Sequence, residues 1–85
     1  MPTRIKICGL TRADDVQAAI DCGADALGFV FYDRSPRHVT LAQAEKLLVR
    51  VPPLVSAVGL FVDAPAAVVR EALAALPLDQ LQFHG

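Results

Sequence analysis

Residues 4–12 read Arg-Ile-Lys-Ile-Cys-Gly-Leu-Thr-Arg and combine an apolar strand, a thiol and a helix start. Alternate side chains of a strand face opposite sides of a sheet. We therefore predict that Ile5 and Ile7 share one face, directed toward a helix layer. Lys6 and Cys8 then share the other face, where we expect polar surroundings.

A helix is predicted directly after the turn at residues 9–10. Thr11 is a suitable N-cap, and the acids at 14 and 15 suit the positive end of a helix. Cys8 would then lie at the carboxyl end of a parallel strand, where open parallel sheets and (β/α)8 barrels bind ligands. A helix N-terminus favours the thiolate form of a nearby cysteine. Cys8 is therefore a candidate functional residue, although a free cysteine often acts as a small buried hydrophobe.

The rest of the chain alternates strand and helix patterns. Strands are predicted over 4–8, 26–31, 54–62 and 80–85, and helices over 11–23, 41–50 and 64–76. Thr40 and Asp63 are predicted N-caps, and Gly23 is a predicted C-cap. Such alternation indicates parallel βα units with right-handed crossovers. A weak internal repeat supports this, because Asp-Ala-Leu-Gly-Phe at 25–29 resembles Asp-Gln-Leu-Gln-Phe at 79–83.

The faces of the outer strands favour a barrel over an open sheet. In the last strand Leu81 and Phe83 alternate with polar residues, as Ile5 and Ile7 do in the first. An open doubly wound sheet buries both faces under helices, whereas the mouth of a barrel can hold polar side chains around a ligand. We predict an α/β fold that comprises the first four strands and three helices of a (β/α)8 barrel. Residues 1–85 would form the amino-terminal half of one domain, truncated after the fourth strand.

The polar connection over 32–39 follows the second predicted strand and contains Arg37 directly after a proline. A guanidinium can hold a carboxylate through two parallel hydrogen bonds. A lone arginine in a loop is more often simply solvated, and both interpretations stay open from spacing alone. His38 is equally well explained as a polar loop residue.

Composition excludes several classes of function. The 85 residues are 54% hydrophobic with a formal charge of −1, so no basic footprint for nucleic acid is present. No apolar run approaches the ~18 residues that a membrane span needs, and the amino terminus leads straight into the first strand rather than into a signal segment. Cys8 and Cys22 have neither metal-site nor disulfide-framework spacing, which agrees with a reducing, cytoplasmic location.

Residues 6–12, Lys-Ile-Cys-Gly-Leu-Thr-Arg, resemble the amino-terminal signature of phosphoribosylanthranilate isomerase, a (β/α)8 enzyme of tryptophan biosynthesis. Further segments match in order at 23–31, 35–37, 58–62 and 81–85, so the resemblance spans essentially the whole chain. It implies an Amadori rearrangement of N-(5-phosphoribosyl)anthranilate, with no metal or organic cofactor.

The resemblance also implies roles for particular residues. Cys8 matches the general base, Arg37 matches the arginine that contacts the anthranilate moiety, and His84 matches a histidine at the end of the fourth strand. The family's general acid is an aspartate on a later strand, and its phosphate site lies after the seventh and eighth strands. Neither region is within these 85 residues, so we expect the isolated chain to be inactive.

Two alternatives to the isomerase half stay open. A non-catalytic half-barrel would present bare strand edges that pair with another copy or with a missing carboxyl-terminal half. An open flavodoxin-like module would instead bind a phosphate group. A chain this short buries only roughly 60–65% of its unfolded surface, and its high apolar content therefore indicates contacts beyond these residues.

Overall fold

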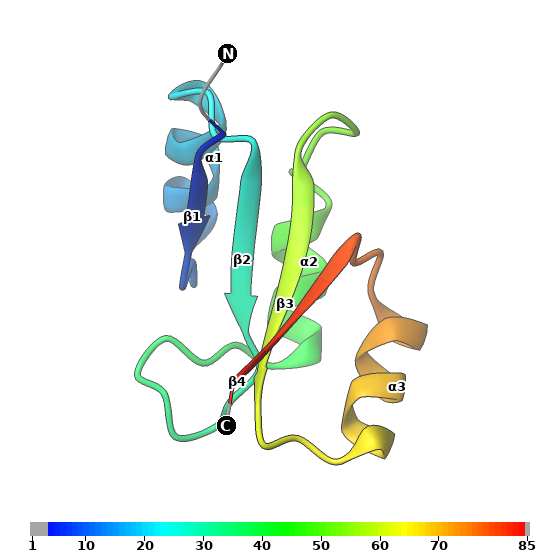
Figure 1. Cartoon of the computed structure of the whole chain (residues 1–85). Coiled ribbons are helices and arrows are strands. Elements are labelled where there is room, and N and C mark those ends of the chain that lie inside the picture. Colours follow the sequence, from blue (N-terminus) through cyan, green and yellow to red (C-terminus); the bar gives the residue numbers. More distant parts are fainter. Residues whose placement is uncertain (1–3, 85) are drawn as a thin grey trace.

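The computed structural model describes residues 4–84 and contains a four-stranded sheet with three helices (Figure 1). The predicted ends at residues 1–3 and 85 lie outside the described residues. The elements are β1 (Lys6–Cys8), α1 (Ala13–Asp21), β2 (Ala26–Val30), α2 (Leu41–Leu48), β3 (Ser56–Val62), α3 (Ala66–Ala75) and β4 (Gln80–His84). All three strand pairs are parallel, as predicted. The sheet order β1-β2-β3-β4 differs from the 2-1-3 order of a flavodoxin-like sheet, so that alternative is wrong.

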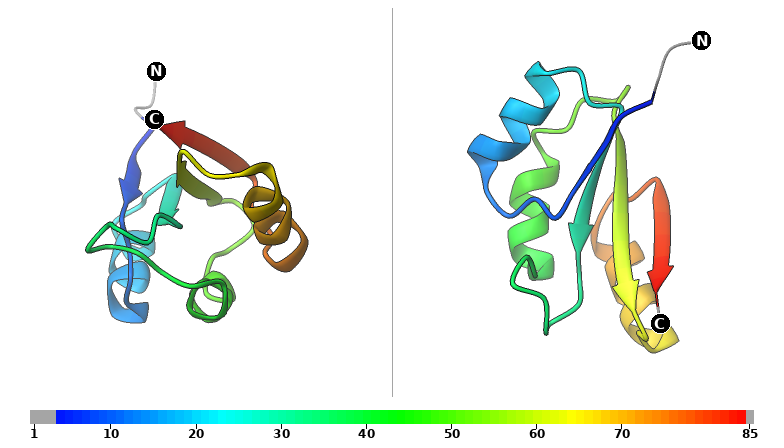
Figure 2. Two further views of the ribbon diagram at one scale, coloured as in Figure 1. Left: turned by 90° about the horizontal axis from the view of Figure 1, so that it is seen from below. Right: turned by 60° about the vertical axis from the view of Figure 1, so that its left-hand side comes forward.

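The three helices lie on one side of a curved sheet, and no helix among the described residues covers the other side (Figure 2). A hydrogen bond from Lys6 Nζ of β1 to Gln82 Oε1 of β4 shows how strong the curvature is. A flat sheet would hold the first and fourth strands about 14 Å apart. The sheet is therefore part of a cylinder, with its helices outside.

Strand register determines which residues share the inner, concave face. Lys6 pairs with Ala26, Cys8 with Gly28, and Val62 with His84. Paired residues of parallel strands point to the same side. The concave face carries Lys6, Cys8, Ala26, Gly28, Val30, Ser56, Val58, Leu60, Val62, Gln80, Gln82 and His84.

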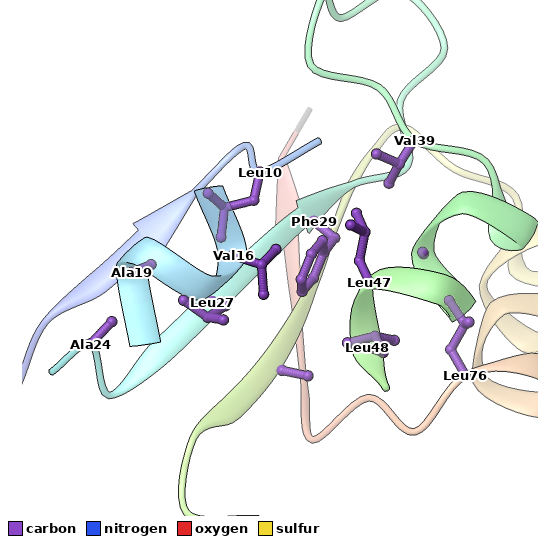
Figure 3. Close-up of a cluster of buried hydrophobic side chains, with 12 residues drawn as sticks. Leu10, Val16, Ala19, Ala24, Leu27, Phe29, Val39, Leu47, Leu48 and Leu76 are labelled. Carbon is purple, nitrogen blue, oxygen red and sulfur yellow. The ribbon is translucent and has the colours of Figure 1, made fainter. Parts of the chain in front are cut away.

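The opposite face of the sheet packs on the helices and forms the core. Side chains from α1, β2 and α2 meet there in one cluster (Figure 3), in which Leu27 and Phe29 are fully buried. Ile7 packs against this cluster, as predicted. Ile5 does not, because β1 is only three residues long and Ile5, 47% exposed, precedes it.

Two of the predicted helix ends are confirmed. Gly23 has φ of 86°, and its N–H donates to Ile20 O while Ala24 N–H donates to Ala19 O, which is the Schellman arrangement. Thr40 caps α2 through a reciprocal pair with Gln43, in which each side chain accepts from the other residue's backbone N–H.

The predicted N-caps Thr11 and Asp63 are wrong, and for the same reason. In both places the backbone is still bonded to the sheet, so the helix begins later than the capping residue suggests. Leu10 N–H donates to Gly28 O, and α1 starts only at Ala13. Asp63 N–H donates to His84 O with φ of 47°, and α3 starts only at Ala66.

The internal repeat has a structural explanation. Asp25 precedes β2, and its Oδ2 accepts from Ile5 N–H at 2.7 Å while its own N–H donates to Ile5 O at 2.8 Å. Asp79 precedes β4 and forms the same reciprocal pair with Ala57, at 2.7 and 2.8 Å. Each aspartate therefore ties the start of its strand to the neighbouring strand.

Replacing Asp79 by alanine should destabilise the fold by about 1.5–3 kcal/mol, because the Ala57 N–H loses a charge-assisted partner. Asp79→Asn keeps an acceptor oxygen and should cost less. Urea unfolding of the 85-residue chain measures both variants. Equal stability of wild type and Asp79→Ala would show that the bond contributes nothing.

Candidate functional site

Cys8 ends β1 on the concave face, and its thiol is free and exposed. The thiol lies above Gly28 of β2: a Cβ built on Gly28 would stand 2.7 Å from Cys8 Sγ. Cys8 is on the concave face of the sheet by register, and no helix among the described residues covers that face (Figure 2). The strand alternation therefore predicted the orientation of Cys8 correctly.

Arg37 packs against the turn that follows Cys8. Gly9 has φ of 83°, and a Cβ on Gly9 would lie 2.5 Å from Arg37 Cδ, so the arginine stem packs directly on the glycine. Arg37 belongs to the loop after β2, where its N–H donates to Ser35 Oγ at 3.1 Å. Within residues 4–84 no carboxylate lies at ion-pair distance from its guanidinium. The exposed guanidinium is thus available to an anionic group beside Cys8.

His84 ends β4 on the concave face and belongs to a chain of polar side chains. Its Nε2 is 2.9 Å from Gln82 Nε2, while Gln82 Oε1 accepts from Lys6 Nζ. An ammonium group can only donate, so Lys6 turns the amide oxygen of Gln82 toward itself and the amide NH2 toward His84. These three polar side chains link β1 to β4 across the concave face.

Lys6 and Gln82 belong to this group of polar side chains, although sequence reasoning did not select them. The available signal was the strand alternation, which put both on the polar face. Their contact depends on sheet curvature, which the sequence pattern does not report. His38 forms an isolated parallel β-bridge with Val30 and is half-buried.

The three candidate residues occupy one end of the sheet. Cys8 and His84 are the last residues of their strands, and Arg37 lies in the loop that follows β2. A cleft of about 410 Å³ at this end, between the loops after β2 and β3, is lined by Tyr32, Arg34 and Asp63, among others. Described residues contain no His, Cys, Asp or Glu group suited to a metal ion, and no helix there is long and apolar enough to span a membrane.

Comparison with known proteins connects this arrangement to one family. Residues 5–85 match the sequence model of N-(5′-phosphoribosyl)anthranilate isomerase. The chain belongs to the N-(5′-phosphoribosyl)anthranilate isomerase family. The isomerase of Thiobacillus denitrificans is 65% identical over all 85 residues, and that of Dechloromonas aromatica is 60% identical. The chain spans only 42% and 41% of the lengths of these two relatives.

Solved isomerase structures share the fold of this chain. The Thermotoga maritima enzyme superposes with a TM-score of 0.94 at 37% identity, over 99% of this chain and 41% of the other. The Thermus thermophilus enzyme gives 0.91 at 37% identity, over 98% and 42%. An isomerase complex with reduced 1-(o-carboxyphenylamino)-1-deoxyribulose 5-phosphate gives 0.94, over 99% and 43%. The predicted fold, four strands and three helices of a (β/α)8 barrel, is confirmed.

Proposed function

We propose that residues 1–85 form the amino-terminal half of a single isomerase barrel. The complete barrel converts N-(5-phosphoribosyl)anthranilate to 1-(2-carboxyphenylamino)-1-deoxyribulose 5-phosphate in tryptophan biosynthesis. Family membership over the whole chain supports this proposal. The observation that carries it is the position of the Cys8 thiol, free and exposed at the carboxyl end of β1 on the concave face.

In this mechanism Cys8 is the general base. A general acid opens the ribose ring to a Schiff base, and the Cys8 thiolate accepts the proton from the neighbouring carbon. The electron pair of that C–H bond moves toward the imine nitrogen and forms an enolamine, which relaxes to the aminoketose. Positioned proton transfer of this kind contributes about 10²–10⁴-fold to a rate. The acid and the phosphate site would come from the carboxyl-terminal half.

Arg37 is proposed to bind the carboxylate of the anthranilate group. Its guanidinium has no ion-pair partner among the described residues, and its stem packs on Gly9, the residue next to Cys8. A carboxylate held there lies beside the proposed base. His84 is proposed to contact the substrate from the opposite side of the concave face, oriented by Gln82.

The carboxyl-terminal half is proposed as the partner that closes the barrel. Phe83 of β4 points toward the helix side of the sheet, where it stacks on Phe61 at 5.9 Å between ring centroids, yet it remains 61% exposed. The outer edges of β1 and β4 have no strand neighbour among residues 4–84. A half-barrel scaffold that pairs with a second copy is the alternative that the same open edges favour. The free cysteines Cys8 and Cys22 support a cytoplasmic location.

Activity can be tested in a whole-barrel chimera, in which residues 1–85 replace the matching part of the Thiobacillus denitrificans isomerase. The chimera should convert N-(5-phosphoribosyl)anthranilate to the aminoketose. Chromatography of substrate and product measures this conversion. A folded chimera without turnover would contradict the proposal.

Replacing Arg37 by methionine in the whole-barrel chimera should raise KM roughly 10- to 100-fold, because a charge-assisted contact to the carboxylate is lost. Methionine preserves much of the apolar stem that packs on Gly9. Arg37→Lys keeps the positive charge but lacks the planar guanidinium. Its KM should therefore lie between those of the unchanged chimera and Arg37→Met. Steady-state kinetics measure the effect, and an unchanged KM in Arg37→Met would exclude the contact.

A further inference from the structure

We propose that Gly28 is a positioning residue for Cys8: the missing side chain at position 28 provides the space that the thiol occupies. This inference rests on the proposed role of Cys8 as the base. Gly28 and Cys8 are direct neighbours in the β1–β2 register, and both lie on the concave face. Any side chain at position 28 would point to the same side as the sulfur.

A methyl group at position 28 would fit only if the Cys8 thiol left its present position. A Cβ on Gly28 would lie 2.7 Å from Cys8 Sγ, 3.2 Å from Cys8 Cβ and 3.3 Å from Cys8 Cα. Rotation about the Cα–Cβ bond of Cys8 relieves only the first of these contacts. The other two are above 3.0 Å, so they require β1 to give by only a few tenths of an ångström.

Gly28 also holds the turn after Cys8 in place, through backbone hydrogen bonds. The carbonyl oxygen of Gly28 accepts from Gly9 N–H at 3.0 Å and from Leu10 N–H at 3.3 Å. A shift of β1 relative to β2 would therefore disturb the turn as well as the sulfur. Arg37 packs on Gly9 of this turn. The two residues proposed to contact the substrate, Cys8 and Arg37, therefore both depend on the position of the turn.

Backbone conformation does not explain the glycine at position 28. Gly9 and Gly23 have positive φ, whereas Gly28 lies in an ordinary strand and is not among the positive-φ residues. Alanine can adopt that conformation. The effect of Gly28→Ala would therefore come from the space that the methyl group takes from Cys8.

Gly59 of β3 provides a matched control. It is also a buried strand glycine, and a Cβ there would lie 2.9 Å from Leu78 Cδ1 and 3.1 Å from Phe61 Cε2. Those contacts are on the helix side of the sheet, away from Cys8. Gly59→Ala therefore introduces similar crowding without touching the thiol.

In the whole-barrel chimera, Gly28→Ala should lower kcat roughly 10- to 100-fold while KM stays within about threefold, since a displacement near 1 Å can cost that much in proton transfer. Gly59→Ala should leave kcat within about threefold. Labelling with iodoacetamide, followed by mass spectrometry, measures the alkylation rates of Cys8 and Cys22. The rate at Cys8 divided by the rate at Cys22 is an internal ratio. This ratio should change at least about fivefold in Gly28→Ala and stay constant in Gly59→Ala, because thiol reactivity depends on the local surroundings.

Thermal unfolding tests the contact without reference to activity. Gly28→Ala should lower Tm by several degrees, and by less than half as much when Cys8 is also alanine, because the sulfur that clashes is then gone. If Gly28→Ala alone does not fold, folding of the double variant would support the proposal and failure of both would overturn it. Equal Tm losses in both backgrounds together with an unchanged labelling ratio would also overturn it. An active Cys8→Ala chimera would refute the proposed base, and the labelling and Tm results would still decide the role of Gly28.

Discussion

Replacing Cys8 by alanine in the whole-barrel chimera should lower kcat by about 10²–10⁴-fold, because the proposed general base is removed. The change is small and leaves a Cβ in place, so the concave face should keep its shape. Cys8→Ser should be nearly as inactive, since a hydroxyl group at neutral pH is a far weaker base than a thiolate. Steady-state kinetics and circular dichroism on the same samples separate loss of chemistry from loss of folding.

Cys22 supplies the internal control for this result. It is also free and exposed, but it is the C-cap of α1 and lies outside the strands that carry the site. Cys22→Ala should therefore keep kcat within about twofold, as expected for a surface change away from the chemistry. A Cys8→Ala chimera with more than a tenth of the original kcat would require another base.

The isolated 85-residue chain should show a turnover at least about 10⁴-fold below that of the whole-barrel chimera. It contains the proposed base without the acid, which alone is worth about 10²–10⁴-fold, and remote phosphate binding also contributes to rate. The same substrate assay measures both proteins at equal concentration. Turnover by the 85-mer that approaches the chimera would contradict the division of catalytic groups between two halves.

Self-association of the isolated 85-residue chain is a second property to measure. The open edges of β1 and β4 and the exposed Phe83 favour pairing with another copy. Sedimentation across a concentration series would detect it. A dimer without activity agrees with the account, because a second copy of residues 1–85 would not supply the proposed general acid.

Much of the fold could be predicted because its signals are local. Strand and helix alternation follows from the spacing of apolar residues, and the end of α1 at Gly23 follows from one residue in the left-handed conformation. Thr40 was recognisable as a cap, and Gln43 completes the capping box three residues later. The starts of α1 and α3 were misplaced because sheet hydrogen bonds continue past the strands, and such bonds depend on a distant partner.

The same distinction applies to the site. The orientation of Cys8 followed from alternation along one strand, and its carboxyl-end position followed from the order of elements. The contacts of Gly28 with Cys8, of Gly9 with Arg37 and of Lys6 with Gln82 depend instead on register, loop path and curvature. Each joins residues at least 20 positions apart, and no local pattern encodes it.

Mixing the purified 85-residue chain with the separately expressed carboxyl-terminal part of the Thiobacillus denitrificans isomerase tests the central claim most directly. We predict that neither part alone converts N-(5-phosphoribosyl)anthranilate, that the mixture does, and that Cys8→Ala in the 85-residue chain abolishes the recovered activity. A mixture that forms a stable complex but stays inactive, or one whose activity survives Cys8→Ala, would contradict the account.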